Sequence, residues 1–258
     1  MIQQNFPFFP SFASNSHAAM SWKNTLPFFI WQSLKYADNR AQFSQLWSYR
    51  KRWSDSFKAN RNSVVDEMPW INFPACEYLE KNLRPEYKVF EYGGGGSTLF
   101  FCKNVAEVTT VEDHEAWFAT LTKIIGEKGY TNWNGEFIVP EPVEGNSRRS
   151  PENPMDFASK AGGKEGLSFE RYARSIDRFP EAYFDLILVD GRARPSCIQQ
   201  ALPHLKKGGL LVVDNTERPY YLAPFQDIIR TQFKTESDRY APVAYTPDFT
   251  KTTVLRKL

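Results

Sequence analysis

The chain has 258 residues and a nearly balanced charge, with 32 basic and 30 acidic residues and a net charge of +2 at neutral pH. This length suits one α/β domain with additions, and the balanced charge gives no sign of a nucleic acid partner. The three cysteines are widely spaced and form no C-x-x-C pair, which argues against a disulfide framework or a zinc site and favours reduced thiols in the cytoplasm. No apolar run approaches the roughly 20 residues of a membrane-spanning helix, so we expect no stable membrane insertion.

Residues 1–68 form an extension whose composition differs from that of the rest of the chain. Residues 1–20 are rich in Pro, Ser and Asn and are expected to be irregular, whereas residues 21–62 are expected to be helical. Aromatic side chains in the helical stretch, such as Trp31, are interleaved with basic ones, such as Lys35. This pattern can bind nucleic acid or a membrane surface. We favour the simpler interpretation, in which the helices pack on the core, cover the site or form a homodimer contact.

Residues 69–258 alternate between strand and helix patterns, which predicts a mostly parallel sheet with helices on both faces. A Pro- and Gly-rich loop interrupts the pattern over residues 140–166, and a loop of this length inside a compact domain is often functional. The expected strands are 87–92, 107–111, 136–139, 184–189, 210–213 and 251–255, and the expected helices are 74–83, 115–126, 169–179, 196–205 and 221–233.

The most informative motif is the glycine run Gly93–Gly96, which follows a buried strand and opens a helix. Glycines allow a ligand to approach the backbone closely, and the helix N-terminus adds free N–H groups and a positive dipole end. Glu112 ends the next strand, where an acidic side chain can accept hydrogen bonds from ribose hydroxyls. No Lys follows the glycines as a phosphate-binding P-loop requires. Glu91 would repel a pyrophosphate and attract an ammonium group, which favours S-adenosylmethionine.

Residues Pro69 to Arg218 resemble a class I S-adenosylmethionine-dependent methyltransferase. The glycine loop matches the first motif of that family, residues 184–191 match its fourth strand, and residues 205–215 match its fifth strand with the turn before it. The resemblance implies a doubly wound, seven-stranded, Rossmann-like α/β sheet whose last strand is antiparallel. The residues that we assign to cofactor binding on this basis are Glu91, Gly93, Gly95, Ser97, Glu112, Asp113 and Asp190.

Three oxygen-bearing side chains follow the fourth and fifth strands and could hold Mg²⁺ or Ca²⁺. They are Asp190, Asp214 and Asn215, and their arrangement is similar to the metal site of catechol- and caffeoyl-CoA-type O-methyltransferases. The sequence departs from that pattern at Arg192 and Arg194, which would repel a metal but suit a carboxylate or phosphate on the acceptor. We take Asp190 and Arg192 as the candidate catalytic residues.

These features together predict methyl transfer from S-adenosylmethionine, with oxygen of a small or saccharide-like molecule as the acceptor. No histidine is well placed to act as a general base, which favours a metal-assisted or proximity-driven transfer. Two alternatives remain open. One is aminopropyl transfer of the spermidine synthase type, which shares the fold and the glycine turn but needs an acidic groove near the fourth strand. The other is a non-catalytic cofactor-binding or interaction module on the same fold.

Overall fold

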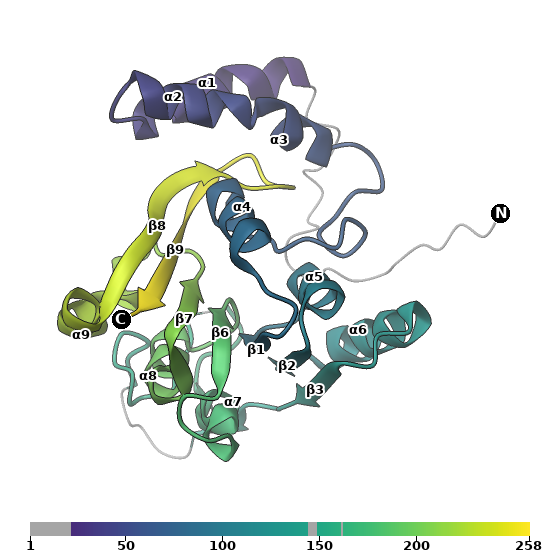
Figure 1. Ribbon diagram of the computed structural model, residues 1–258, viewed down its shortest axis with the longest axis vertical. Coiled ribbons are helices and arrows are strands. Elements are labelled where there is room, and N and C mark those ends of the chain that lie inside the picture. The colour runs from purple at the N-terminus through teal and green to yellow at the C-terminus, as the bar shows by residue number, and fades with distance from the viewer. Residues whose placement is uncertain (1–21, 144–148, 161) are drawn as a thin grey trace.

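The computed structural model describes residues 22–143, 149–160 and 162–258, and a seven-stranded sheet forms its centre (Figure 1). The strand order is β3-β2-β1-β6-β7-β9-β8. All neighbouring strands are parallel except that β9 runs antiparallel to β7 and to β8. The predicted fold class is therefore confirmed. The strands are β1 (Lys88–Tyr92), β2 (Glu107–Glu112), β3 (Trp133–Phe137), β6 (Phe184–Val189), β7 (Leu205–Val213), β8 (Phe233–Pro242) and β9 (Phe249–Lys257).

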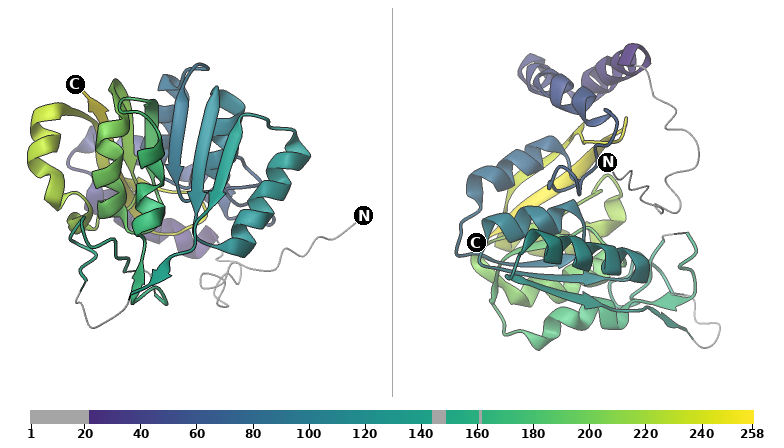
Figure 2. Two further views of the ribbon diagram at one scale, coloured as in Figure 1. Left: turned by 90° about the horizontal axis from the view of Figure 1, so that it is seen from below. Right: turned by 90° about the vertical axis from the view of Figure 1, so that its right-hand side faces the viewer.

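The central strands are buried on both faces because successive apolar side chains point to opposite sides of the sheet. On β1, Phe90 joins one core cluster and Val89 the other, and on β6, Ile187 and Leu188 divide in the same way. Helices α4 (Phe73–Asn82), α5 (Gly96–Asn104) and α6 (Glu115–Lys128) cover one face. Helices α7 (Glu170–Arg174), α8 (Arg194–His204) and α9 (Gln226–Gln232) cover the other, so the sheet lies between two helical layers (Figure 2).

The predicted elements are least accurate in the C-terminal third. The helix expected over 221–233 is reduced to two 3₁₀ turns and the short α9, and the strand β8 was not predicted at all. β8 is an edge strand whose polar residues face solvent on one side, so it lacks the apolar run by which the buried strands are recognised. The helix expected over 169–179 is α7 followed by a 3₁₀ turn, and β7 begins at Leu205, five residues earlier than expected.

The N-terminal helices pack on the ends of the last two strands. Helices α1 (Trp22–Tyr36), α2 (Arg40–Ser48) and α3 (Arg50–Ser56) form a separate layer beyond the tips of β8 and β9 (Figure 1). The buried rings of Phe29 and Trp53 lie 4.9 Å apart, and Phe29 lies 5.2 Å from Phe249 of β9. The indole N–H of Trp53 donates to the carbonyl oxygen of Thr246 at 2.9 Å. Within the described ranges, no helix has the length and apolar character needed to cross a membrane.

The segment that joins this layer to α4 lies directly on the glycine loop. A Cβ atom at Gly96 would overlap the carbonyl oxygens of Ser63 and Met68. Glu67, held at a left-handed φ of 48°, forms ion pairs with Lys103 of α5 and Lys128 of α6. The extension and the first turn of α5 are therefore packed against each other, which fixes the position of the loop from outside.

We predict that Gly96→Ala destabilises the protein by about 1–3 kcal/mol, the usual cost of an added methyl group in a filled space. The matched control is Gly95→Ala, because a Cβ atom at Gly95 would meet no heavy atom within 4 Å. Urea unfolding of the ligand-free protein measures both free energies. Equal stability of the two variants would show that residues 63–68 do not press on the loop in solution.

Candidate functional site

The candidate site lies at the topological switch point of the sheet, where strands β2 and β3 are added on one side of β1 and strands β6 and β7 on the other. β1 pairs with β2 on one side and with β6 on the other, and ligands of open α/β sheets bind at the carboxyl ends of the strands at such a point. The turns after β1 and β6 touch, because a Cβ atom on Gly93 would lie 2.8 Å from the Cα atom of Gly191. Gly93 also has a φ of +89°, which a side chain would oppose. The two turns thus meet at Gly93 and Gly191, where neither residue has a side chain to keep them apart.

Glu91 is fully buried beneath the first turn of α5. Its Oε2 atom accepts hydrogen bonds from the hydroxyls of Thr98 at 2.5 Å and Thr110 at 3.0 Å. Burial raises the pKa of Glu91 to about 7, although the hydroxyls of Ser97, Thr98 and Thr110 act in the opposite direction. Its Oε1 atom has no hydrogen-bond partner among the described residues. Buried carboxyl oxygens normally accept a hydrogen bond, so Oε1 is available to accept one from a ligand.

Glu112 holds the glycine loop in place. Its carboxylate accepts backbone N–H bonds from Gly94 at 3.0 Å, Asp113 at 2.9 Å and His114 at 3.0 Å. Burial and the neighbouring Asp113 raise the pKa of Glu112 to about 7. A ribose-binding role for Glu112 stays a prediction. Its structural role, tying the ends of β1 and β2 together, was not foreseen.

Asp113 connects three segments of the site edge. Its carboxylate lies 2.8 Å from the Lys164 ammonium, in the loop before β5 (Leu167–Ser168), and 3.4 Å from the Nε atom of Arg192. The Arg192 side chain is 41% exposed, so its guanidinium borders solvent. Part of the long loop thereby reaches the candidate site. Residues 144–148 and 161 of that loop lie outside the described residues.

Tyr172 of α7 is a site residue that the sequence did not reveal. It is 1% exposed, and its hydroxyl has no hydrogen-bond partner among the described residues. A Cβ atom at Gly191 would overlap this hydroxyl, so the phenol stands against the turn between Asp190 and Arg192. In the sequence Tyr172 is one aromatic among several in a predicted helix, and no pattern distinguishes it from a core residue.

The predicted metal site is occupied by an arginine side chain. Arg194 is 7% exposed, and its guanidinium donates to Asp190 Oδ1 at 2.8 Å and to Asn215 Oδ1 at 3.2 Å. The same group donates to the backbone oxygens of Asp190 and Gly191, each at 3.2 Å, and of Asp214. All five N–H donors of the arginine are thereby used.

The donor set does not fit a divalent metal, and the prediction of Mg²⁺ or Ca²⁺ ligation is corrected accordingly. A permanent cation already lies between Asp190 and Asn215. Asp214 accepts a hydrogen bond from the Thr252 hydroxyl at 2.5 Å, and burial together with the charge of Asp190 raises the pKa of Asp214 to about 8. No group of three or more His, Cys, Asp or Glu side chains in the described part of the chain is placed to hold a metal ion. Arg194 turns inward to bond Asp190 and Asn215, which the sequence did not show.

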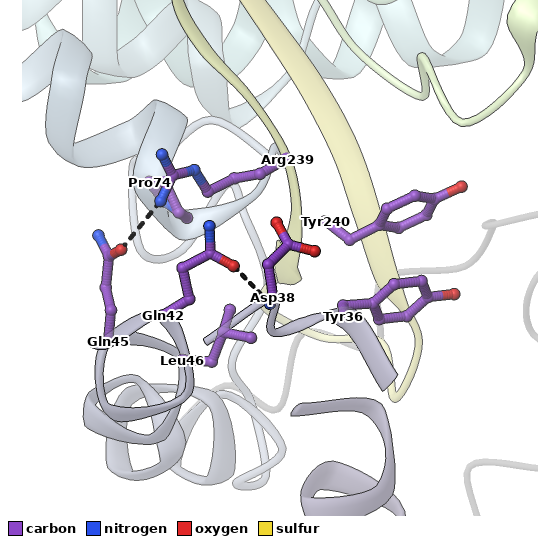
Figure 3. A pocket seen from close by; sticks show the side chains of 8 residues that line it. All are labelled: Tyr36, Asp38, Gln42, Gln45, Leu46, Pro74, Arg239 and Tyr240. Carbon is purple, nitrogen blue, oxygen red and sulfur yellow. Dashed lines mark hydrogen bonds between the residues drawn. The ribbon is translucent and has the colours of Figure 1, made fainter. Parts of the chain in front are cut away.

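A separate small cavity of about 30 Å³ lies between the N-terminal helices and β8 (Figure 3). Gln45 and Arg239 hydrogen bond across it at 3.2 Å, and the rings of Tyr36 and Tyr240 stack 4.1 Å apart at its rim. The volume has room for only a few water molecules, and none of the site residues described above lines it. The cavity is therefore a packing feature of the helical layer.

We predict that Arg194→Ala lowers the free energy of unfolding by about 3–5 kcal/mol, because it leaves the buried Asp190 carboxyl unpaired. Arg194→Lys should be intermediate, since lysine keeps the charge but has three donors. Arg192→Ala is the control, and loss of its partly exposed ion pair should cost about 1 kcal/mol or less. Chemical unfolding measures all three. A melting temperature that rises with Mg²⁺ in the parent but not in Asp214→Asn would contradict the correction made above.

Comparison with known proteins finds neighbours only at the level of structure. No protein-family model matches the chain, and no curated protein matches it. An O-methyltransferase from Bacillus cereus, solved in complex with SAH, superposes with a TM-score of 0.51 and 12% identity over 81% of this chain and 91% of that one. A Corynebacterium glutamicum protein gives a TM-score of 0.50 and 12% identity over 82% and 96%. An rRNA methylase from Streptococcus thermophilus covers 70% of this chain and 93% of its own at 12% identity, with a TM-score of 0.46.

At these identities the similarity concerns the fold alone. The strand order, the antiparallel β9 and the glycine turn at the end of β1 agree with it. This chain has the fold of the class I S-adenosylmethionine-dependent methyltransferases.

Proposed function

We propose that this protein transfers a methyl group from S-adenosylmethionine to a small-molecule acceptor. The observation that supports this proposal is the set of buried carboxyl groups at the carboxyl edge of the sheet. Burial raises the pKa of Glu91 and Glu112 to about 7, of Asp190 to about 6 and of Asp214 to about 8. Arg194 is the buried cation among them. Such a site favours a ligand that brings positive charge, and S-adenosylmethionine carries an ammonium and a sulfonium.

The cofactor would be held by residues from three turns. Gly93, Gly95 and Ser97 offer a close backbone approach at the start of α5, and Glu91 would accept from the ammonium through its unpartnered Oε1. Glu112 and Asp113 would meet the ribose. When bound, the cofactor supplies an electrophilic methyl group on sulfur, and the remaining task of the protein is to align an acceptor oxygen with it.

Asp190 and Arg192 would act on the acceptor. Burial raises the pKa of Asp190 to about 6, so the carboxylate is mostly ionised at neutral pH, and Arg194 holds its Oδ1 atom. The Oδ2 atom could then take the proton of an acceptor hydroxyl. Arg192, which is partly exposed, could hold an anionic group of the same acceptor. His114 is a poor base, because its Nδ1 atom caps α6 by accepting from the Trp117 N–H at 3.2 Å.

Calorimetry separates the candidate functions. Binding of S-adenosylmethionine supports methyl transfer or a cofactor-binding module, preference for its decarboxylated form supports aminopropyl transfer, and no binding of either supports an interaction module. Methyl transfer from labelled cofactor to small hydroxyl and saccharide acceptors, with a structured RNA as a further arm, then tests the acceptor class. The proposal includes a cytoplasmic location, which the three buried, unpaired cysteines support.

We predict that stabilisation by S-adenosylhomocysteine increases with pH. Burial raises the pKa of Glu91 from 4.5 to about 7, so between these values the ligand-free folded state binds more protons than the unfolded state and loses stability as pH rises. A bound ammonium favours the ionised carboxylate and opposes that loss. The rise in melting temperature with ligand should therefore grow from about pH 5.5 to about pH 8. Glu91→Gln should flatten the slope and the exposed control Glu115→Gln should not. A slope that is the same in Glu91→Gln as in the parent would exclude Glu91 from the ammonium site.

We predict that Tyr172→Phe weakens S-adenosylhomocysteine binding without destabilising the ligand-free protein. Its buried hydroxyl has no partner in the described chain, so removing it costs the empty fold nothing, whereas a lost bond to the ligand costs about 1.4 kcal/mol, or tenfold in affinity. The matched control is Tyr92→Phe, whose hydroxyl donates to the Ala173 carbonyl at 2.7 Å and whose loss should lower stability. Calorimetry and thermal unfolding measure both effects. Unchanged affinity in Tyr172→Phe would place its hydroxyl away from the ligand.

A further inference from the structure

Helix α1 presents a large apolar face to solvent. Phe29, Gln32 and Ser33 are buried against the rest of the protein, whereas Trp31 is 53% exposed and Leu34 is 64% exposed on the opposite side of the helix. Trp47 of α2 is 36% exposed and its ring lies 6.3 Å from that of Phe29, so it stands beside α1. We call Phe28, Trp31, Leu34, Lys35, Trp47 and Arg50 the outer face. In Figure 1 and in the right-hand view of Figure 2 the helical layer stands at one end of the molecule.

The helical layer that carries the outer face is more basic than the chain as a whole. Residues 22–58 contain seven basic and two acidic residues, whereas the whole chain has an excess of only two positive charges. Two of the cations lie over the aromatic rings: the Lys35 ammonium is 5.1 Å from the ring centroid of Trp31, and the Arg50 guanidinium is 4.8 Å from that of Trp47. A partner that covers this face must therefore be anionic and must also accept apolar side chains.

We propose that the outer face binds the surface of an anionic lipid bilayer, with the helices lying in the plane of the interface. Interfacial helices combine Trp, Phe and Leu on one side with Lys and Arg around them, and they bind through apolar burial together with attraction to anionic headgroups. Leu34 and the exposed edges of Trp31 and Trp47 would enter the headgroup boundary. Lys35 and Arg50 would meet the lipid phosphates.

Other occupants fit less well. A second copy of the chain, related by a twofold axis, would place like charges opposite each other. Single-stranded nucleic acid binds by stacking bases on aromatic faces, but the ring of Trp31 is stacked on Phe28 at 5.6 Å and that of Trp47 on Phe43 at 6.2 Å. Leu34, the most exposed of these side chains, offers nothing to stack on.

The position of the face gives the interaction a consequence for the site. β9 is antiparallel to β7, with Thr253 opposite Val213, so Phe249 lies beyond the carboxyl end of β7. Phe29 of α1 packs on Phe249, which places the helical layer at the same edge of the sheet as Asp190 and Asp214. A protein bound through the outer face would hold this edge close to the bilayer. The inference concerns binding and does not depend on methyl transfer.

Sedimentation with vesicles tests the proposal. The full chain should sediment with equimolar phosphatidylglycerol and phosphatidylcholine at about 0.1 M salt, and at least tenfold more weakly, by order of magnitude, with phosphatidylcholine alone. The double variant Trp31→Ser/Leu34→Ser and the charge variant Lys35→Glu/Arg50→Glu should each lose about tenfold or more in affinity for the anionic vesicles. The control is Val139→Ser/Met155→Ser, which removes two exposed apolar side chains elsewhere and should bind as the parent does.

Each variant should keep the melting temperature of the parent. An unchanged melting temperature would show that weaker vesicle binding does not come from unfolding. Three results would overturn the proposal. The first is binding that is absent, or equal on neutral and anionic vesicles. The second is full binding by Trp31→Ser/Leu34→Ser. The third is evidence that another molecule occupies the outer face. This would be a dimer in sedimentation velocity that Trp31→Ser/Leu34→Ser dissociates, or binding of a single-stranded RNA that the same variant weakens while vesicles are not bound.

Discussion

The side chain of Arg194 joins the ends of the two strands on which the candidate site depends. Its five donors are all used on the turns that follow β6 and β7, and Tyr221 lies 5.2 Å from its guanidinium. Parallel strands have no hairpin to fix their ends relative to each other. A buried guanidinium with five directed bonds fixes them instead, and the low dielectric around it makes each bond costly to break. The orientation of Asp190 therefore follows from Arg194 and does not require a metal ion.

The same burial creates an imbalance of charge. Glu91, Glu112 and Asp214 are carboxyl groups withdrawn from water, and burial raises the pKa of each into the range of about 7 to 8. One arginine cannot neutralise all of them. The site therefore disfavours an anion and favours a cation, and the partly exposed Lys164 and Arg192 pair with Asp113 at its margin. A ligand with positive charge at two atoms relieves this imbalance better than a neutral one.

The sequence predicted the elements whose pattern is local. The glycine turn after a buried strand, the acidic ends of β1 and β2, and the apolar strand β6 follow from periodicity within a few residues, and each lies where it was expected. β8 was missed because its polar side faces water, so no apolar run marks it. The roles of Arg194 and Tyr172 were missed for another reason: whether a side chain turns into the protein depends on contacts with residues far along the chain. Arg194 hydrogen bonds to Asn215, and the hydroxyl of Tyr172 lies against Gly191. Neither contact can be predicted from the spacing of neighbouring residues in the sequence.

The contacts of the first helices with the last strands impose an order on how the protein matures. Gln32 bonds the carbonyl of Pro247 and the N–H of Phe249, and Trp53 bonds the carbonyl of Thr246, across separations of 193 to 217 residues. During synthesis these helices are made before their partners in the last strands, and at the usual rate of synthesis the interval is roughly 10–40 s. During that interval Phe29 and Trp53 have no core to enter. These aromatic helices therefore stay uncovered until β9 has been made, and folding depends more than in a protein of local contacts on a chaperone or on rapid synthesis.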